Sequence, residues 1–105
     1  GNNRTITRDG SGAFTCRLHG APIVIARPHG ASGTITINLD ACGYLTTTTI
    51  AAMRDFLAVF GVAGSASRAG GKLSARWHDG EKWVERDSAD GGSMSFSAAR
   101  DPVIA

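Results

Sequence analysis

Apolar and polar side chains alternate along three stretches in the first part of the chain, which is the two-residue period of a strand with one buried face. The clearest stretch is 34–39, TITINL, where every second residue is Ile or Leu. The stretch 13–19 alternates in the same way, so that its Phe, Cys and Leu share one face. The β-branched run 23–26 follows a Gly-Ala-Pro break, and we expect it to pair with 13–19 as a hairpin.

The period changes at four consecutive threonines, 46–49, after which the apolar residues recur at helical spacing. The apolar stripe comprises Ile50, Met53, Leu57 and Phe60, and it is widened by Ala52, Phe56 and Val59. We expect the hydroxyl of Thr46 or Thr47 to cap the start of this helix. Gly61 stands where a left-handed residue commonly ends a helix.

The rest of the chain predicts further short strands. They lie at 72–78, 81–86 and 93–97. The Gly- and Ser-rich stretch 61–71 is predicted to be a flexible connection. The order is therefore β-β-β-α-β-β-β, and we expect an α+β fold with one amphipathic helix packed on one face of a mostly antiparallel sheet. Residues 1–10 and 98–105 are expected to be loosely ordered.

Trp77 and Trp83 lie on either side of Asp79-Gly80, and the length of the turn decides how they face. A two-residue turn puts Trp77 on the apolar face of the hairpin and Trp83 on the opposite face, beside Arg76. A three-residue loop with a bulge puts both on one face. The first alternative separates apolar from polar residues better, and it leaves Trp83 able to stack on a base or anchor a partner. In the competing arrangement, the N-terminal strand or the C-terminal tail covers Trp83.

Length and composition suit one globular domain, 1–105, and they narrow the classes of function. The polar N-terminus does not resemble a secretory signal, and no apolar run is long enough to span a membrane. Two cysteines do not form a disulfide framework, so we expect a cytoplasmic protein in the host cell. The net charge of +2 is weak, although Arg4, Arg8, Arg17 and Arg27 concentrate positive charge in the first third.

Candidate catalytic and metal sites are poorly supported by the residue pattern. The residues with zinc-ligand chemistry are Cys16, His19, His29 and Cys42. On a strand, however, Cys16 and His19 point to opposite faces, and Cys16 belongs with the apolar set. No strand-to-helix nucleophile turn and no phosphate-binding glycine loop is present. We therefore expect no enzyme, no metal and no cofactor.

The stretch 37–61 contains the pattern G-Y-x-T-x-T-T before a helix that bears Met and Arg and ends in F-G-V. This segment resembles a recurrent group of small proteins encoded by phages and prophages, in which a later hairpin carries W-x-V. The matching positions are Gly43, Tyr44, Thr46, Thr48, Thr49, Met53, Phe60, Gly61, Trp83 and Val84. Cys42 departs from the pattern, where a small residue is usual. The resemblance implies a phage or prophage source and an order of elements, but no activity.

The sequence thus predicts a non-enzymatic phage or prophage accessory protein of unknown function that binds another macromolecule, and we expect that partner to be a protein. The alternative is a small nucleic-acid-binding module that uses the N-terminal arginines and an exposed Trp. We expect no membrane partner, whereas the open edges of a sheet also allow a homo-oligomer. The candidate binding residues are Trp83, Arg76, Arg17, Arg27, Tyr44, Thr46 and Thr48.

Overall fold

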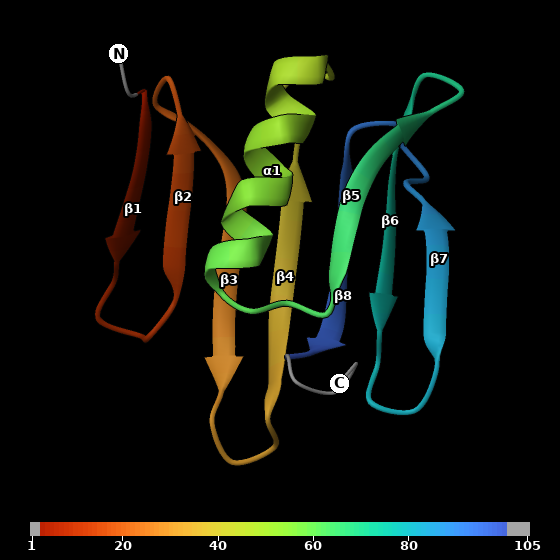
Figure 1. Cartoon of the computed structure of the whole chain (residues 1–105). Helices are drawn as coiled ribbons and strands as arrows, with labels where there is room; N and C mark the ends of the chain where they lie inside the picture. Colours follow the sequence, from red (N-terminus) through yellow and green to blue (C-terminus); the bar gives the residue numbers. More distant parts are fainter. Residues whose placement is uncertain (1–2, 101–105) are drawn as a thin grey trace.

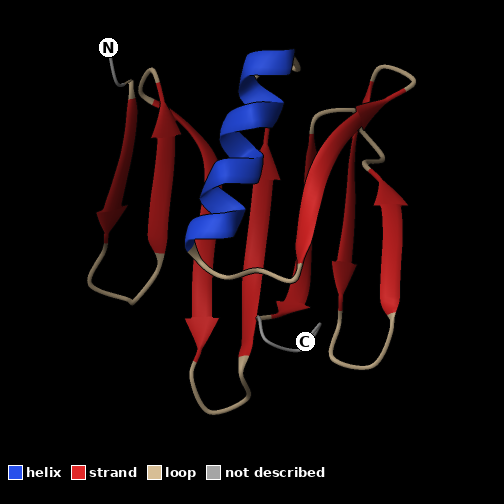
Figure 2. Cartoon of the chain, viewed as in Figure 1, coloured by secondary structure: helices blue, strands red, loops and turns tan. Residues whose placement is uncertain are grey.

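The computed structural model describes residues 3–100 and contains eight strands and one helix. The elements are β1 (Arg4–Arg8), β2 (Phe14–Leu18), β3 (Ala21–His29), β4 (Thr34–Asp40), α1 (Thr47–Val59), β5 (Gly64–Ala69), β6 (Lys72–His78), β7 (Trp83–Asp87) and β8 (Ser93–Ala99). All pairings between strands are antiparallel. The expected α+β class with an antiparallel arrangement and one helix is confirmed (Figure 2).

The strands form two sheets rather than the single sheet that the sequence suggested. The larger sheet has the order β1-β2-β3-β4-β8, and the smaller one has the order β5-β6-β7. Helix α1 lies across one face of the larger sheet in front of β3 and β4, with β5 beside it (Figure 1). The chain enters the smaller sheet after the helix and returns as β8 to the edge of β4.

Two strands were not predicted, and both lie in segments without a strong apolar alternation. Strand β1 occupies half of the stretch 1–10 that was expected to be loosely ordered, and it pairs along its whole length with β2. Strand β5 occupies much of the predicted flexible connection. In the stretch 98–105, Ala98 and Ala99 belong to β8 and are buried, while Arg100 forms a bridge with Val62. Residues 1–2 and 101–105 lie outside the described part.

Both ends of α1 are closed as the sequence indicates. The side-chain oxygen of Thr46 accepts a hydrogen bond from the backbone N–H of Thr49, which makes Thr46 the N-cap. At the other end, the N–H groups of Gly61 and Val62 donate to the carbonyls of Ala58 and Leu57, with Gly61 at a φ of 67°. This pair of bonds is the Schellman arrangement, which requires the left-handed conformation that glycine adopts at little cost.

Replacing Thr46 with alanine is expected to destabilise the fold by about 1 kcal/mol, because the N–H of Thr49 then loses its partner. The matched control is Thr47→Ala, which removes a neighbouring exposed threonine without removing the cap. Urea unfolding of the two variants, followed by circular dichroism, measures the difference. Equal stability of the two variants would show that Thr46 does not act as the cap.

The hydrophobic core lies between α1 and the inner face of the larger sheet, and it continues into the smaller sheet. The largest side chains that are almost fully enclosed come from both sheets and the helix: Ile23, Ile35, Ile37, Leu39, Met53, Leu57 and Leu73. Most of the predicted helix stripe is buried, including Phe60, but Val59 is 66% exposed because it points away from the buried side of the last helical turn. The prediction for Val59 was therefore wrong.

The register between β6 and β7 determines which way the two tryptophans face. His78 pairs with Trp83 and Trp77 pairs with Val84, which leaves residues 79–82 in the loop. The loop is longer than the two residues predicted, but a shift of two residues keeps every side chain on its face. Trp77 is consequently buried and stacks on Phe96, with the ring centroids 4.2 Å apart. Trp83 lies on the other face and is 40% exposed.

The connection from β7 to β8 is held by Asp90. Its carboxylate accepts hydrogen bonds from the backbone N–H groups of Gly92 and Ser93 and from the hydroxyl of Ser93. These bonds favour the charged form and lower the pKa of Asp90 from 3.8 to about 2. The carboxylate thus stabilises the turn that leads the chain back into the larger sheet.

The stability that Asp90 contributes is expected to be complete above pH 3.8 and to fall as the pH approaches 2. The unfolded chain binds the proton more readily than the folded chain, so acidification through this window favours unfolding. Urea midpoints measured across this range should fall less steeply for Asp90→Asn than for the native chain. Glu81→Gln removes one charge from another exposed turn and serves as the control. If the urea midpoint of Asp90→Asn fell with pH as steeply as that of the native chain, Asp90 would not be the source of this pH dependence.

Candidate functional site

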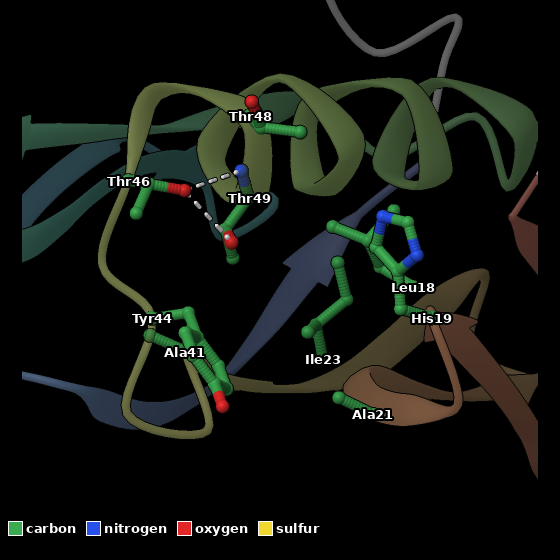
Figure 3. A pocket seen from close by; sticks show the side chains of 9 residues that line it. All are labelled: Leu18, His19, Ala21, Ile23, Ala41, Tyr44, Thr46, Thr48 and Thr49. Atoms are coloured by element: carbon green, nitrogen blue, oxygen red, sulfur yellow. Dashed lines mark hydrogen bonds between the residues drawn. The ribbon is translucent and has the colours of Figure 1, made fainter.

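A surface pocket of about 460 Å³ opens beside the start of α1. Its walls come from three places: the β2–β3 hairpin, the segment that follows β4, and the start of the helix (Figure 3). Nine residues line it, namely Leu18, His19, Ala21, Ile23, Ala41, Tyr44, Thr46, Thr48 and Thr49. A volume of this size falls within the range of small-ligand pockets in proteins.

The hairpin and an irregularity in β3 build the floor of the pocket. His19 and Gly20 have φ values of 51° and 83°, which is the geometry of a tight two-residue turn between antiparallel strands. The β2–β3 register shifts after Cys16, so that Cys16 pairs with Val24 while Arg17 pairs with Pro22. The extra residue is Ile23, which is buried beside Val24 instead of alternating with it. The bulge therefore supplies the apolar side chain between the hairpin and the helix.

The rim of the pocket is polar and contains hydroxyl groups and the imidazole of His19. Tyr44 is 67% exposed, which is unusual for an aromatic ring beside an apolar floor. The hydroxyl of Thr46 is committed to Thr49, both to its N–H and to its hydroxyl. None of the nine lining residues is Asp, Glu, Lys or Arg. The pocket thus offers apolar contact surface below and hydroxyl groups above.

The structure distributes the seven predicted binding residues over three places. Tyr44, Thr46 and Thr48 lie together at the pocket. Arg76 and Trp83 lie together on the outer face of the smaller sheet, where the guanidinium carbon is 4.2 Å from the centre of the indole ring. His78 completes this group with an edge contact to Trp83, the ring centroids being 5.3 Å apart. The predicted exposed Trp next to Arg76 is therefore present, but it is not part of the pocket.

Arg17 and Arg27 lie on the face of the larger sheet that points away from the helix. Arg17 donates to the hydroxyl of Thr7 on the neighbouring strand at 2.9 Å. Arg27 donates to the carbonyl and the hydroxyl of Ser11 at 3.0 and 3.1 Å. Arg17 thus contacts a hydroxyl group, whereas Arg27 contacts a carbonyl and a hydroxyl group and lies close enough to the Asp9 carboxylate to help lower its pKa.

Sequence reasoning missed most of the pocket floor. Leu18 and Ile23 were assigned only to predicted strands, and Ala41 was not singled out. The signal that could have revealed the pocket is the pairing of His19-Gly20 as a two-residue turn, followed by two adjacent apolar residues at 23 and 24 where alternation should continue. The register shift itself depends on contacts between strands, so this sequence pattern alone does not fix which residues pair.

Cysteine and histidine are dispersed in the structure. Cys16 is fully buried, and burial raises the pKa of its thiol to about 11, so it behaves as an apolar core residue. Cys42 is partly exposed, and burial together with the neighbouring Asp40 carboxylate raises its pKa. Both thiols are free. Within residues 3–100, no three His, Cys, Asp or Glu side chains gather in a way that could hold a metal ion.

The one helix in the described part of the chain is not long and apolar enough to cross a membrane. Comparison of the chain with protein-family models, with curated proteins and with solved structures found no match.

Proposed function

We propose that this chain is a non-enzymatic accessory protein of a phage or prophage that acts in the host cytoplasm by binding another protein. The proposed contact is an apolar side chain of the partner seated in the pocket beside the start of α1. The observation that carries the proposal is the combination of an apolar floor with the 67% exposed ring of Tyr44 at its rim. The phage or prophage source is supported by the resemblance of the G-Y-x-T-x-T-T segment.

The chemistry of the lining favours a protein partner. Interface centres are enriched in aromatic residues and depleted in charged ones, and a Tyr ring beside an apolar depression is a frequent anchor. Tyr44 and Thr48 add hydroxyl-bearing side chains to the lining around the apolar floor. Because the rim holds no fixed charge, the pocket favours a neutral, apolar group over a phosphate or a carboxylate.

The same lining favours binding over catalysis. General acid–base or nucleophilic chemistry needs two or more groups in contact with one reacting atom. The nine lining residues include one imidazole, that of His19, and neither a carboxylate nor a thiol. The Thr46 hydroxyl is held by the helix cap. We therefore propose that the pocket positions a partner and does not transform it.

Selection from a library of displayed random peptides tests this proposal, because the library offers every kind of side chain to the pocket at once. The native chain is compared with Ala21→Phe, which fills the pocket from its floor, and with Ala31→Phe, which adds the same side chain to an exposed turn. We expect peptides that share an apolar residue to be enriched by the native chain and by Ala31→Phe, but not by Ala21→Phe. Equal enrichment by all three proteins would overturn the proposal.

A second candidate function rests on the outer face of the larger sheet. The strand residues on that face include Arg17, Arg27 and His29 among hydroxyl side chains, and the acidic residue on it, Asp40, stands at the end of β4. A surface with this balance attracts phosphate groups, which supports the alternative of a nucleic-acid-binding module. Trp83 lies on the other sheet, so base stacking on that ring is not required for it.

Binding of short single-stranded RNA or DNA to the native chain and to the double variant Arg17→Gln/Arg27→Gln tests this candidate. We expect affinity that weakens steeply with salt and is largely lost in the double variant. The control Lys72→Gln/Lys82→Gln removes the same charge from the smaller sheet and its loop. Equal losses of affinity in both double variants would show that only net charge matters, and they would exclude this face as a specific binding surface.

A further inference from the structure

Strand β1 forms one edge of the larger sheet, and its outward backbone groups can be identified. The carbonyl of Asn3 accepts from the N–H of His19 at 2.8 Å, and the N–H of Asp9 donates to Ala13 at 2.9 Å. Antiparallel pairing alternates with a period of two, so the odd-numbered residues direct their backbone groups toward β2. The N–H and C=O groups of Ile6 and Arg8 therefore point away from β2, where no other described strand pairs with them.

The side chain of Ile6 is also incompletely covered. Ile6 pairs with Cys16, which is fully buried, so both side chains lie on the inner face of the sheet. Ile6 is nevertheless 42% exposed because the sheet ends at β1. An apolar side chain at the margin of the core and a row of outward backbone groups thus occur on the same strand. A further strand alongside β1 would cover both.

The sequence of β1, Arg-Thr-Ile-Thr-Arg, reads the same in both directions. An antiparallel partner of identical sequence, centred on Ile6, would place Ile6 opposite Ile6 and Thr5 opposite Thr7. We propose that β1 pairs with β1 of a second copy of this chain around a two-fold axis at Ile6. The two larger sheets then form one continuous sheet, and Ile6 of each copy covers the other. This is the isologous contact that two-fold dimers use.

The same register sets Arg4 opposite Arg8 of the second copy, and like charges directly opposite each other oppose pairing. Asp55 of α1 compensates, because its carboxylate forms an ion pair with Arg4 and is itself 64% exposed. The second guanidinium is brought to the same carboxylate. Arg8 also has a contact within its own copy, since its guanidinium carbon lies 5.8 Å from the ring centre of Phe14. In the proposed dimer, the Asp55 carboxylates of the two copies thus lie near the side chains of Arg4 and Arg8 of both copies.

Sedimentation velocity over a hundredfold range of protein concentration, about the range needed to resolve a weak dimer, tests the proposal. A contact along one short strand lies at the small end of interface sizes, so we expect dimers at micromolar concentration or above. Ile6→Pro removes an outward N–H without removing a bond to β2, and it should abolish the dimer. Ile6→Val keeps the N–H and the apolar contact, and it should preserve the dimer. Asp55→Asn should weaken it several-fold.

Cross-linking tests the register independently of the effect of proline on folding. The native cysteines are first replaced by Cys16→Ala and Cys42→Ser, because Cys16 pairs with position 6 and would compete. The proposed axis brings the Cα atoms at position 6 to about 5.5 Å, within reach of a disulfide. We expect Ile6→Cys to form a covalent dimer under mild oxidation and Thr5→Cys not to. Equal cross-linking of both variants, or a monomer at every concentration, would overturn the proposal.

Discussion

Replacing Trp77 with alanine is expected to destabilise the protein by about 3–5 kcal/mol, which is the usual cost of removing a large buried aromatic side chain. Trp77 is 5% exposed and stacks on Phe96 of β8 with the ring planes 15° apart. The guanidinium carbon of Arg86 lies 5.1 Å from the centre of the Trp77 ring. Because β6 and β8 belong to different sheets, the stacked pair joins the two sheets. Its loss leaves a cavity at the junction.

Trp83→Ala is the matched control, since it removes the same side chain from the exposed face of the same hairpin. Its ring contacts Arg76 and His78, and an exposed cation–π contact contributes about 0.5–1 kcal/mol. Urea denaturation monitored by far-ultraviolet circular dichroism measures both variants without depending on tryptophan fluorescence. A loss of stability in Trp83→Ala as large as that in Trp77→Ala would contradict the assignment of faces in the hairpin.

Replacing Gly64 with alanine is expected to cost about 3 kcal/mol or more, although only one methyl group is added. A Cβ atom at this position would lie 2.5 Å from the carbonyl oxygen of Arg76 and 2.8 Å from the Cα atom of Trp77. Both atoms belong to the backbone of β6, with which Gly64 pairs. A rotamer change cannot relieve the overlap, so β5 and β6 must separate. The expected result is a lower urea midpoint.

Gly30→Ala is the control for Gly64→Ala. Gly30 lies in the β3–β4 turn, its φ is not left-handed, and a Cβ there would meet no atom within 4 Å. Alanine at that position is expected to change stability by less than about 1 kcal/mol in either direction. If both variants unfold at the same urea concentration as the native chain, the close approach of β5 to β6 is not as the structure has it.

The elements that the sequence predicted are those whose pattern follows from burial on one side. The alternation in 34–39 and the helical stripe after Thr47 arise because one face packs on the core, and both elements were found within a residue or two. Strand β6 was predicted with its observed bounds. Thr46 and Gly61 were identified because capping depends on local chemistry that is visible in the sequence.

The elements that were missed are held by contacts between strands rather than by their own pattern. Strand β1 exposes four of its five residues to a substantial degree, and β5 consists mostly of Gly, Ala and Ser. Such segments carry little apolar signal, and only the neighbouring strand defines them. The division into two sheets likewise depends on which strand β8 joins. It joins β4, which lies more than 50 residues earlier in the chain. A single sequence does not encode that pairing locally.

The candidate site was predicted in part for the same reason. Tyr44, Thr46 and Thr48 were singled out from one continuous segment, and the structure places them together. Their separation from Arg17, Arg27 and the Trp83 group reflects tertiary arrangement. The pocket floor depends on the bulge at Ile23, which only the pairing of β2 with β3 reveals.

The most direct test of the proposed pocket is a nuclear magnetic resonance titration of the labelled protein with the amides N-acetyl-leucinamide and N-acetyl-phenylalaninamide. These probes present single apolar side chains without charge. We predict saturable shifts at the methyl groups of Leu18 and Ile23 and at the backbone amides of residues 44–48, and their loss in Ala21→Phe. Shifts scattered over the surface, or shifts at the pocket that persist unchanged in Ala21→Phe, would contradict the proposed binding site.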